Sequence, residues 1–313
     1  MISTLMLISI LDLLLGINIL SPILLIQKSL GGPEVVQVDS GSIPYLLPAN
    51  ETNYFPIRDW GVQDPFLTAR SVTLYDASSD KVLYSVNSET RLPIASLTKF
   101  MTAVVVIENI GLNDVVEIKS SAIEKSKKEG GGNDLYEGEK IKAGDLLKIM
   151  LIESSNVAAY ALVGHFGEKY GGDFVGKMNE KARELGMSDT FFTEAAGLDD
   201  KNSFSTGQEL VKLVKYSFRY ENFYQILKTK KAEITSVDGN LSHQVLNTNK
   251  LLGVLFNIVG GKTGFTELAG GSLVLVTEAP QGGRIISIVL GSNDRFSDAK
   301  ELVEWSNKAY IWR

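Results

Sequence analysis

The sequence contains Ala95-Ser96-Leu97-Thr98-Lys99, followed directly by the apolar run Phe100-Met101-Thr102-Ala103-Val104-Val105-Val106-Ile107. A serine and a lysine three residues apart on a helix lie on the same face, so the Lys99 amine can reach the Ser96 hydroxyl. The pair is a nucleophile beside a candidate base, provided that burial or a neighbouring cation lowers the lysine pKa from about 10.4. The fold would have to supply that environment through desolvation and hydrogen bonds.

The Ser-x-x-Lys pattern is weak by itself, because the chain holds three copies. Ser78-Ser79-Asp80-Lys81 lies among turn formers, and Ser297-Asp298-Ala299-Lys300 lies close to the C-terminus. Only Ser96 opens a long apolar segment after Pro93, so only this copy predicts a pair at the start of a buried helix. For an isolated copy, the simpler interpretation is a helix cap plus a solvated lysine.

Composition excludes several function classes. The 313 residues are 44% hydrophobic and 22% charged, as in globular proteins of one large domain or two modest ones. The net charge of -6 argues against a nucleic-acid partner, which would require a basic face. The absence of cysteine excludes disulfides, zinc-thiolate sites and a cysteine nucleophile. The two histidines, His165 and His243, are most simply structural or surface residues, which leaves lysine as the natural base.

The N-terminal segment, residues 1–30, predicts a membrane anchor or a signal. Residues 2–26 are mostly Leu and Ile and match the length of a hydrocarbon core, although they are interrupted by Asp12, Asn18 and Pro22. No basic residue precedes Lys28, and no clear small-residue cleavage site is present. These features favour an uncleaved signal anchor over a cleaved signal peptide, with a buried soluble helix as the third alternative.

A proline-rich segment follows. Residues 31–66 carry five of the eight prolines, a spacing that opposes both helix and central strand and predicts an extended linker. The domain proper is therefore expected to span residues 67–313.

The pattern within residues 67–313 predicts an α+β fold. Alternation around a cluster of turn formers predicts a hairpin over residues 71–86. Helical patterns then occupy the middle of the chain, after residue 96 and at 144–152, 157–163, 174–185 and 208–218, with a loop at 125–134. Strand patterns come last, at 232–237, 257–266, 271–277 and 285–291, before a C-terminal helix at 298–311. The early hairpin is expected to pair with the late strands, with the helical block on one side of the sheet.

Two more motifs lie downstream of the Ser96 pair. Ser154-Ser155-Asn156 separates two apolar helical segments, and its simplest interpretation is an N-cap for the second helix. Lys262-Thr263-Gly264 lies in a predicted strand. There it can offer a cation and a hydroxyl to a carboxylate, while Gly264 lets a substrate lie against the backbone. The alternative for this motif is a hairpin strand with a solvated lysine.

The order Ser-x-x-Lys, Ser-x-Asn and Lys-Thr-Gly is that of the serine penicillin-recognising enzymes. Residues 67–313 resemble the low-molecular-mass D-alanyl-D-alanine carboxypeptidases, peptidase family S11. Further matches are Tyr75-Asp76, Lys81-Val82-Leu83, residues 93–102 and 147–159, Gly197-Leu198-Asp199, Asn247-Thr248-Asn249 and residues 260–270. The resemblance implies a β-lactamase/transpeptidase-like fold, in which helices pack on an antiparallel sheet and an all-helical subdomain is inserted. It implies neither a cofactor nor a metal.

The resemblance also implies roles for individual residues. Ser96 would attack the carbonyl of a D-Ala-D-Ala bond while Lys99 takes its proton. Ser154 would relay a proton to the leaving D-alanine, and Asn156 would hold both the substrate amide and Lys99. The oxyanion hole would consist of the backbone N–H groups of Ser96 and Phe265, each worth about 3 kcal/mol.

Other residues would bind the substrate. Lys262 would supply positive potential, Thr263 would bind the terminal carboxylate, and Gly264 would leave room for the substrate. Arg295 lies near a position where relatives carry a carboxylate-binding basic residue, although it is equally well interpreted as a surface arginine that caps the last helix. Phe265 and Gly271-Ser272 depart from the polar or aromatic residues common after Lys-Thr-Gly.

The implied partners are peptidoglycan stem peptides ending in D-Ala-D-Ala, β-lactams as acylating inhibitors, and a membrane that residues 2–26 would enter. An anchor would hold the catalytic domain at the cell membrane on the cell-wall side, whereas a cleaved signal would release it. A class A β-lactamase is one alternative, but none of Glu168, Glu180, Glu184 and Glu194 lies in a Glu-x-x-Leu-Asn setting. A non-catalytic module that binds stem peptides is the other alternative, and the presence of every catalytic side chain argues against it.

Overall fold

The computed structural model describes residues 55–128 and 135–312. The predicted anchor, residues 1–30, and most of the predicted linker lie outside the described residues. Within the described ranges, no helix combines the length and apolar character that crossing a bilayer requires.

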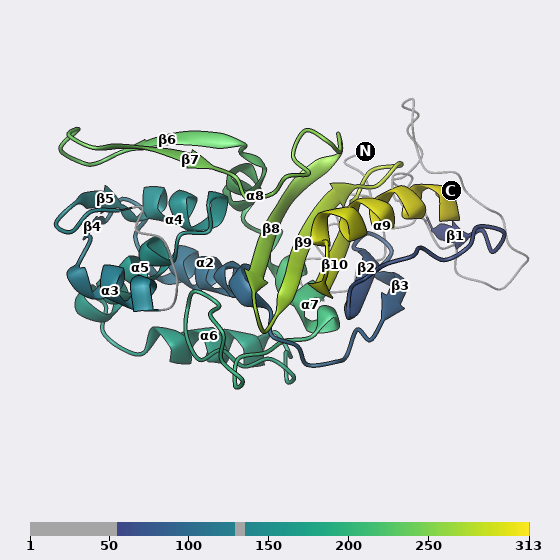
Figure 1. The fold of residues 1–313 in the computed structure, drawn as a ribbon, viewed down its shortest axis with the longest axis horizontal. Coiled ribbons are helices and arrows are strands. Elements are labelled where there is room, and N and C mark those ends of the chain that lie inside the picture. Colours follow the sequence, from purple (N-terminus) through teal and green to yellow (C-terminus); the bar gives the residue numbers. More distant parts are fainter. Residues whose placement is uncertain (1–54, 129–134, 313) are drawn as a thin grey trace, which may run out of the picture. The chain divides into compact units, whose positions relative to one another are not determined.

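The domain is built on a five-stranded antiparallel sheet with strand order β3-β2-β10-β9-β8 (Figure 1). Its strands are β2 (Ser71–Asp76), β3 (Lys81–Val86), β8 (Ile258–Thr266), β9 (Gly270–Glu278) and β10 (Arg284–Ser292). The early hairpin, β2 and β3, joins the late strands through β10, where Ile288 lies opposite Thr73. The predicted α+β class and the pairing of the first hairpin with the last strands are therefore confirmed.

Both faces of this sheet are covered, because successive side chains of a strand point to opposite faces. In β10, Ile286 and Ile288 belong to the core shared with the helical block, whereas Ile285 and Val289 belong to a second core. The second core lies under α9 (Arg295–Ala309), and the first face is covered by α7 (Gly207–Ser217) and α8 (Glu221–Lys228).

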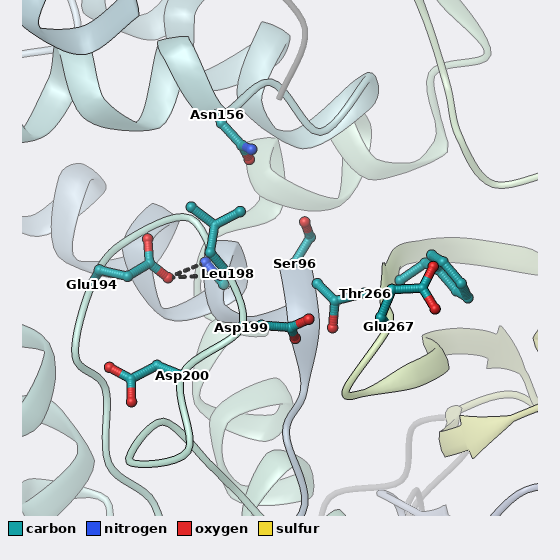
Figure 2. A pocket seen from close by; sticks show the side chains of 10 residues that line it. Ser96, Asn156, Glu194, Leu198, Asp199, Asp200, Thr266 and Glu267 are labelled. Atoms are coloured by element: carbon teal, nitrogen blue, oxygen red, sulfur yellow. Dashed lines mark hydrogen bonds between the residues drawn. The ribbon is translucent and has the colours of Figure 1, made fainter. Parts of the chain in front are cut away.

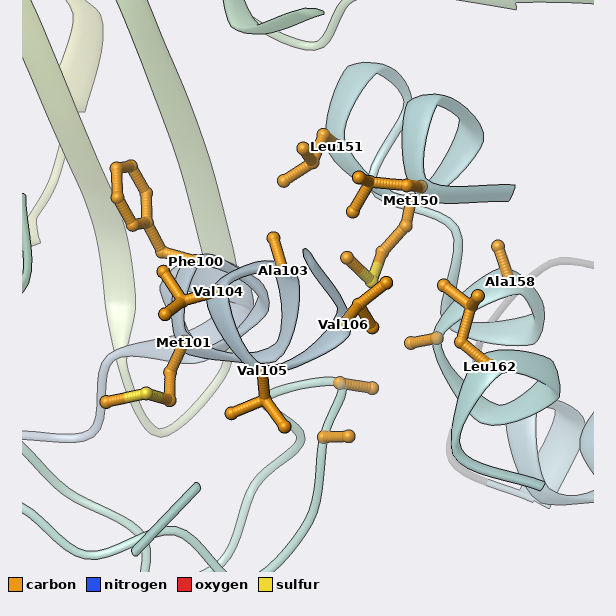
Figure 3. Close-up of a cluster of buried hydrophobic side chains, with 14 of the residues drawn as sticks. Phe100, Met101, Ala103, Val104, Val105, Val106, Met150, Leu151, Ala158 and Leu162 are labelled. Carbon is orange, nitrogen blue, oxygen red and sulfur yellow. The ribbon is translucent and has the colours of Figure 1, made fainter. Parts of the chain in front are cut away.

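The helix that follows Ser96 is buried on every side. A short 3₁₀ turn, Ala95–Leu97, leads into α2 (Thr98–Asn109), whose residues 98–106 are all buried. Figure 3 shows the side chains of α2 radiating in all directions, some toward Met150 on α4 (Ala143–Ile152) and Leu162 on α5 (Asn156–Lys169). A helix that is apolar all round belongs to a core, and this packing fixes the position of its first turn, next to Ser96.

The remaining helices are α3 (Ser120–Lys128) and α6 (Phe174–Glu184). In the described residues the short strands form three more pairs, of which two are β4 (Val115–Glu117) with β5 (Lys140–Lys142) and β6 (Lys231–Thr235) with β7 (Ser242–Leu246). The predicted boundaries of α4, α6 and α7 are right to one residue. Three other helices differ from prediction: α3 runs into the start of the predicted 125–134 loop, α5 extends to Lys169 beyond the predicted end at residue 163, and α8 was not predicted.

The edges of the domain also differ from the sequence prediction. β1 (Pro56–Arg58) pairs with β11 (Tyr310–Trp312), and Trp305 Nε1 donates a hydrogen bond to Gln63 O at 2.8 Å. Residues 55–66, assigned above to the linker, are thus part of the domain. The last helix begins at Arg295 instead of residue 298, since the Asp294 carboxylate accepts hydrogen bonds from the first backbone N–H groups, and it ends where β11 begins.

Candidate active site

Ser96 lies on a tightly held turn. Ala95 has a φ of 51°, a left-handed conformation that non-glycine residues rarely adopt. Gly197, with a φ of 84°, packs against the peptide bond that follows Ala95, and a Cβ at this position would lie 1.9 Å from Ala95 O. A Cβ on Gly264 would lie 3.0 Å from Ser96 N. Two glycines therefore let two distant segments approach the backbone of Ser96, and residues held in strained conformations of this kind cluster at functional sites.

Lys99 lies one turn further along and is 0% exposed. Its Nζ is 3.0 Å from Ser96 Oγ, 2.6 Å from Asn156 Oδ1 and 2.6 Å from Ala196 O. The Ala196 carbonyl and the Asn156 amide oxygen can only accept hydrogen bonds. In a neutral amine these two oxygens take the two N–H groups, which leaves the lone pair for the Ser96 hydroxyl. The arrangement suits Lys99 to act as the base.

Ser154 and Asn156 lie at the start of α5. Ser155, between them, is the N-cap: its hydroxyl accepts a hydrogen bond from Ala158 N at 3.0 Å. Ser154 is half-buried and has a φ of 70°, so this turn is strained like the one before Ser96. Because Ser155 supplies the cap, Ser154 and Asn156 are available for other roles, and Asn156 uses its amide oxygen to orient Lys99.

The Lys-Thr-Gly motif lies on β8, at the edge of the sheet. Lys262 is 1% exposed, and its Nζ donates to Thr263 O at 3.0 Å. The Thr263 and Thr248 hydroxyls are 2.6 Å apart. Burial, and secondarily the charges of Lys99 and Arg295, lowers the pKa of Lys262 well below its usual range. A buried lysine differs from the solvated lysine that was the alternative for this motif.

Arg295 adds a second cation to this side of the site. Its pKa is lowered, mainly by partial burial. Its Nε is buried without a hydrogen-bond partner among the described residues. The guanidinium carbon lies 5.9 Å from the ring centroid of Phe265, which is 57% exposed. Since Asp294 caps α9, Arg295 is not the helix cap, and its unpartnered nitrogen suits the binding of an anion.

A cleft of about 660 Å³ is lined by Ser96 and Asn156 and, from the end of β8, by Phe265, Thr266 and Glu267. Lys262, Thr263 and Arg295 are not among its lining residues, although Gly264, next to Thr263, packs against Ser96. Figure 2 shows the Ser96 hydroxyl and the Asn156 amide pointing into the same space, beside a loop that carries Glu194, Leu198 and Asp199. We call α2, this loop (residues 194–200) and the start of α5 the helical wall. The strand wall consists of β8 and the first turn of α9.

The sequence analysis missed part of the helical wall. Gly197 was noted only as part of a family match, although its missing side chain is what lets the loop approach Ser96. Ala196 acts through its backbone carbonyl, so no side-chain pattern could have indicated it. Thr248 belongs to a quoted match, Asn247-Thr248-Asn249, to which no role was given.

The four glutamates considered for a β-lactamase base are all engaged elsewhere. Glu168 pairs with Lys119, Glu180 with Lys177 at 2.8 Å, and Glu184 with Lys181 at 2.6 Å. Only Glu194 lines the cleft, and both of its carboxylate oxygens accept hydrogen bonds from nearby protein groups. The arrangement disfavours a class A deacylation base.

Comparisons with known proteins show the family of this chain. Residues 59–294 match the sequence profile of D-alanyl-D-alanine carboxypeptidases, peptidase family S11. A D-alanyl-D-alanine endopeptidase of Haemophilus influenzae is 36% identical over 68% of this chain and 72% of its own length. The D-alanyl-D-alanine carboxypeptidase DacC of Escherichia coli is 33% identical over 78% of this chain and 62% of its own length. The crystal structure of the Streptomyces K15 DD-transpeptidase has a TM-score of 0.73 and 28% identity, covering 79% of this chain and all of that one. The chain therefore belongs to the D-alanyl-D-alanine carboxypeptidase family, peptidase family S11.

Proposed function

We propose that this protein removes the terminal D-alanine from peptidoglycan stem peptides through an acyl-enzyme on Ser96. The observation that carries the proposal is the buried Lys99 amine, whose Nζ lies 3.0 Å from Ser96 Oγ and is oriented by two acceptors. Lys99 takes the Ser96 proton as Oγ bonds to the carbonyl carbon. The backbone N–H groups of Ser96 and Phe265 would stabilise the oxyanion, a contribution of about 3 kcal/mol for each donor.

Collapse of the tetrahedral intermediate breaks the C–N bond. The leaving D-alanine needs a proton on its nitrogen, and Ser154 would deliver it, drawing a replacement from the protonated Lys99. Water then attacks the ester on Ser96, which releases the shortened stem peptide and restores the hydroxyl. Asn156 would hold the substrate amide while it orients Lys99.

The strand wall would bind the terminal carboxylate. The buried Lys262, the Thr263 hydroxyl and the unpartnered Nε of Arg295 provide cations and donors on this wall. Ionised acceptors form stronger hydrogen bonds than neutral ones, so a free carboxylate is the group that this wall suits best. The carboxylate of a β-lactam would bind in the same place and lead to a penicilloyl ester on Ser96.

The test uses the soluble part of the chain from residue 55 with a diacetylated Lys-D-Ala-D-Ala peptide and with fluorescent penicillin. We expect release of D-alanine and stoichiometric labelling, both lost in Ser96→Ala. Rapid catalytic turnover of penicillin would favour a β-lactamase instead. If the protein neither releases D-alanine nor is labelled by penicillin, the remaining interpretation is a module that binds stem peptides without cleaving them.

A second activity is suggested by the relative of Haemophilus influenzae, whose name is D-alanyl-D-alanine endopeptidase and which is 36% identical. In a cross-linked dimer the scissile bond again follows a D-alanine, but the leaving group carries a second stem peptide. The same two walls would act, with that peptide extending out of the cleft. Incubation with purified cross-linked muropeptide dimers should yield monomers. If the dimers stay intact while the D-Ala-D-Ala peptide still releases D-alanine, the enzyme has carboxypeptidase activity without endopeptidase activity.

We propose further that residues 2–26 hold the protein at the cell membrane, with the domain on the cell-wall side. The length and apolar composition of this segment support the proposal. Fractionation of cells that express the full chain should place it in the membrane pellet, extractable by detergent but not by high salt. Full-length protein in the soluble fraction would contradict the anchor, and a shortened soluble form would indicate a cleaved signal.

A further inference from the structure

Glu194 binds the loop that it begins. Its carboxylate Oε2 accepts hydrogen bonds from Ala196 N at 2.6 Å and from Tyr160 OH at 2.8 Å. Its Oε1 accepts from Gly197 N and, at 2.9 Å, from Leu198 N. One side chain thus receives three consecutive backbone N–H groups and a tyrosine hydroxyl, and the dashed lines in Figure 2 mark part of this network.

The loop held in this way reaches the catalytic helix at successive residues. Ala196 O accepts the hydrogen bond from Lys99 Nζ, and Ala195 O accepts one from Thr102 Oγ1 at 2.7 Å. The next residue, Gly197, is the one that packs against the Ala95 carbonyl. A shift of the loop would therefore move both the acceptor that orients the base and the surface that supports the nucleophile.

The side-chain partner of Glu194, Tyr160, is also held in a fixed position. Tyr160 is 6% exposed and lies on α5, the helix whose first residue is Asn156. Because Asn156 and Ala196 are the two acceptors that orient Lys99, the contact between Tyr160 and Glu194 ties together the two elements that supply them.

We propose that Glu194 is a positioning residue for the acylation step, which sets the Ala196 carbonyl against Lys99 and the Gly197 backbone against Ser96. The inference rests on the proposed serine mechanism and adds a residue that acts through Lys99 without touching the substrate. It also assigns Glu194 to holding the loop that orients Lys99 instead of to the activation of water.

An amide cannot replace this carboxylate. Both carboxylate oxygens accept, whereas a glutamine of the same shape has one accepting oxygen and one donating NH₂ group. In Glu194→Gln the NH₂ group must face either the N–H groups of Gly197 and Leu198 or the donors Ala196 N and Tyr160 OH. At least one side of the network is lost, with no change in side-chain volume.

The test measures acylation by fluorescent penicillin as a function of its concentration, which separates the limiting rate constant from the apparent binding constant. We expect Glu194→Gln to lower the limiting rate constant by about 10- to 100-fold, the scale of a small misplacement of reacting groups. Final labelling should reach the wild-type amount, and the binding constant should change little. Tyr160→Phe should give a smaller reduction, about 3- to 10-fold, because it removes one of the donors.

Glu180→Gln is the matched control, since it makes the same chemical change at an exposed α6 residue paired with Lys177, and its rate constant should equal that of wild type. A Glu194→Gln variant with a wild-type rate constant overturns the proposal. So does one whose only defects are a lower melting temperature or a smaller labelled fraction. If Glu194→Gln does not fold, the Tyr160→Phe variant decides, and a wild-type acylation rate constant in that variant overturns the proposal. Wild-type protein that is neither labelled nor active would instead refute the proposed function, before any variant is compared.

Discussion

The helical wall and the strand wall hold their cations in different ways. On the helical wall, Lys99 and the loop that begins at Glu194 are hydrogen-bonded within the protein. On the strand wall, burial lowers the pKa of Lys262, whose Nζ donates a hydrogen bond to Thr263 O, and Arg295 Nε has no hydrogen-bond partner among the described residues.

The difference separates two tasks. Groups that perform chemistry must hold one geometry before the substrate arrives, so their partners are supplied by the protein. Groups that bind an anion keep hydrogen-bond donors unused until the ligand arrives. Burying such charged groups without a full set of partners lowers the stability of the fold. Substitutions on the two walls should therefore have different kinetic signatures.

The largest effect is expected from Lys99→Met on the helical wall. The variant has an unbranched side chain that ends one atom before the amine and therefore has no base, so the limiting rate constant for acylation should fall by about 10²- to 10⁴-fold. Stopped-flow or gel measurements with fluorescent penicillin check this, and the apparent binding constant should stay near that of wild type. A residual rate close to wild type would show that another group takes the Ser96 proton.

Gly197→Ala tests how tightly the helical wall is packed. The new Cβ would lie 1.9 Å from Ala95 O at a φ of 84°. We expect a loss of about 2–4 kcal/mol in the free energy of unfolding, measured by denaturant titration. The control is Gly164→Ala, an exposed position in α5 where a Cβ meets nothing within 4 Å. It should gain about 0.5–1 kcal/mol from helix propensity, and equal effects at the two glycines would contradict the packing argument.

Arg295→Gln tests the strand wall. Loss of a cation that binds the carboxylate should raise KM for the D-Ala-D-Ala peptide about 10- to 100-fold, the scale of a hydrogen bond to a charged group. The turnover number should change much less, because Arg295 does not contact the reacting bond. A fall in kcat at constant KM would place Arg295 in the chemical step and remove the distinction between the walls.

Lys262→Met should separate stability from function. Because burial and neighbouring cations lower the folded-state pKa of Lys262 below the unfolded value of about 10.4, protonation favours unfolding. This cost is complete at pH values below the folded-state pKa and disappears as pH rises to about 10.4. The variant should therefore melt at a higher temperature than wild type near neutral pH, by a margin that shrinks at alkaline pH, while losing activity. Calorimetry across pH checks the sign, and a lower melting temperature would show that Lys262 stabilises the fold.

The smallest effect is expected at the C-terminal copy of Ser-x-x-Lys. Lys300 pairs with Glu304 at 3.6 Å, and both side chains are nearly half-exposed. Lys300→Ala should change the free energy of unfolding by at most about 0.5 kcal/mol and leave acylation unchanged. A lower acylation rate in this variant would mean that the Ser-x-x-Lys spacing alone, without burial of the lysine, makes a serine and a lysine functional.

The sequence analysis was most successful where local pattern and burial coincide. The alternating pattern of residues 71–86 and of the late strands predicted the sheet and the pairing of its first hairpin with a late strand. Such a pattern is informative because alternation reflects which face of a strand is buried. It was least successful where long-range pairing decides the structure. β1 consists of three residues in a proline-rich segment and forms only because β11 lies beside it, and no local signal of residues 56–58 indicates that partner.

For the site, the amino-acid sequence by itself determined which residues we propose for the chemistry and their order along the chain, because Ser96 opens an apolar helix and the other motifs follow it. Only the tertiary structure decided how Lys99 is oriented, how Gly197 supports Ser96, and that Lys262 and Arg295 share one wall with donors left for an anion. The physical reason is that orientation depends on a backbone carbonyl, a missing side chain and the burial of charge. Each of these is set by segments that lie far apart in the sequence and meet only in the folded protein.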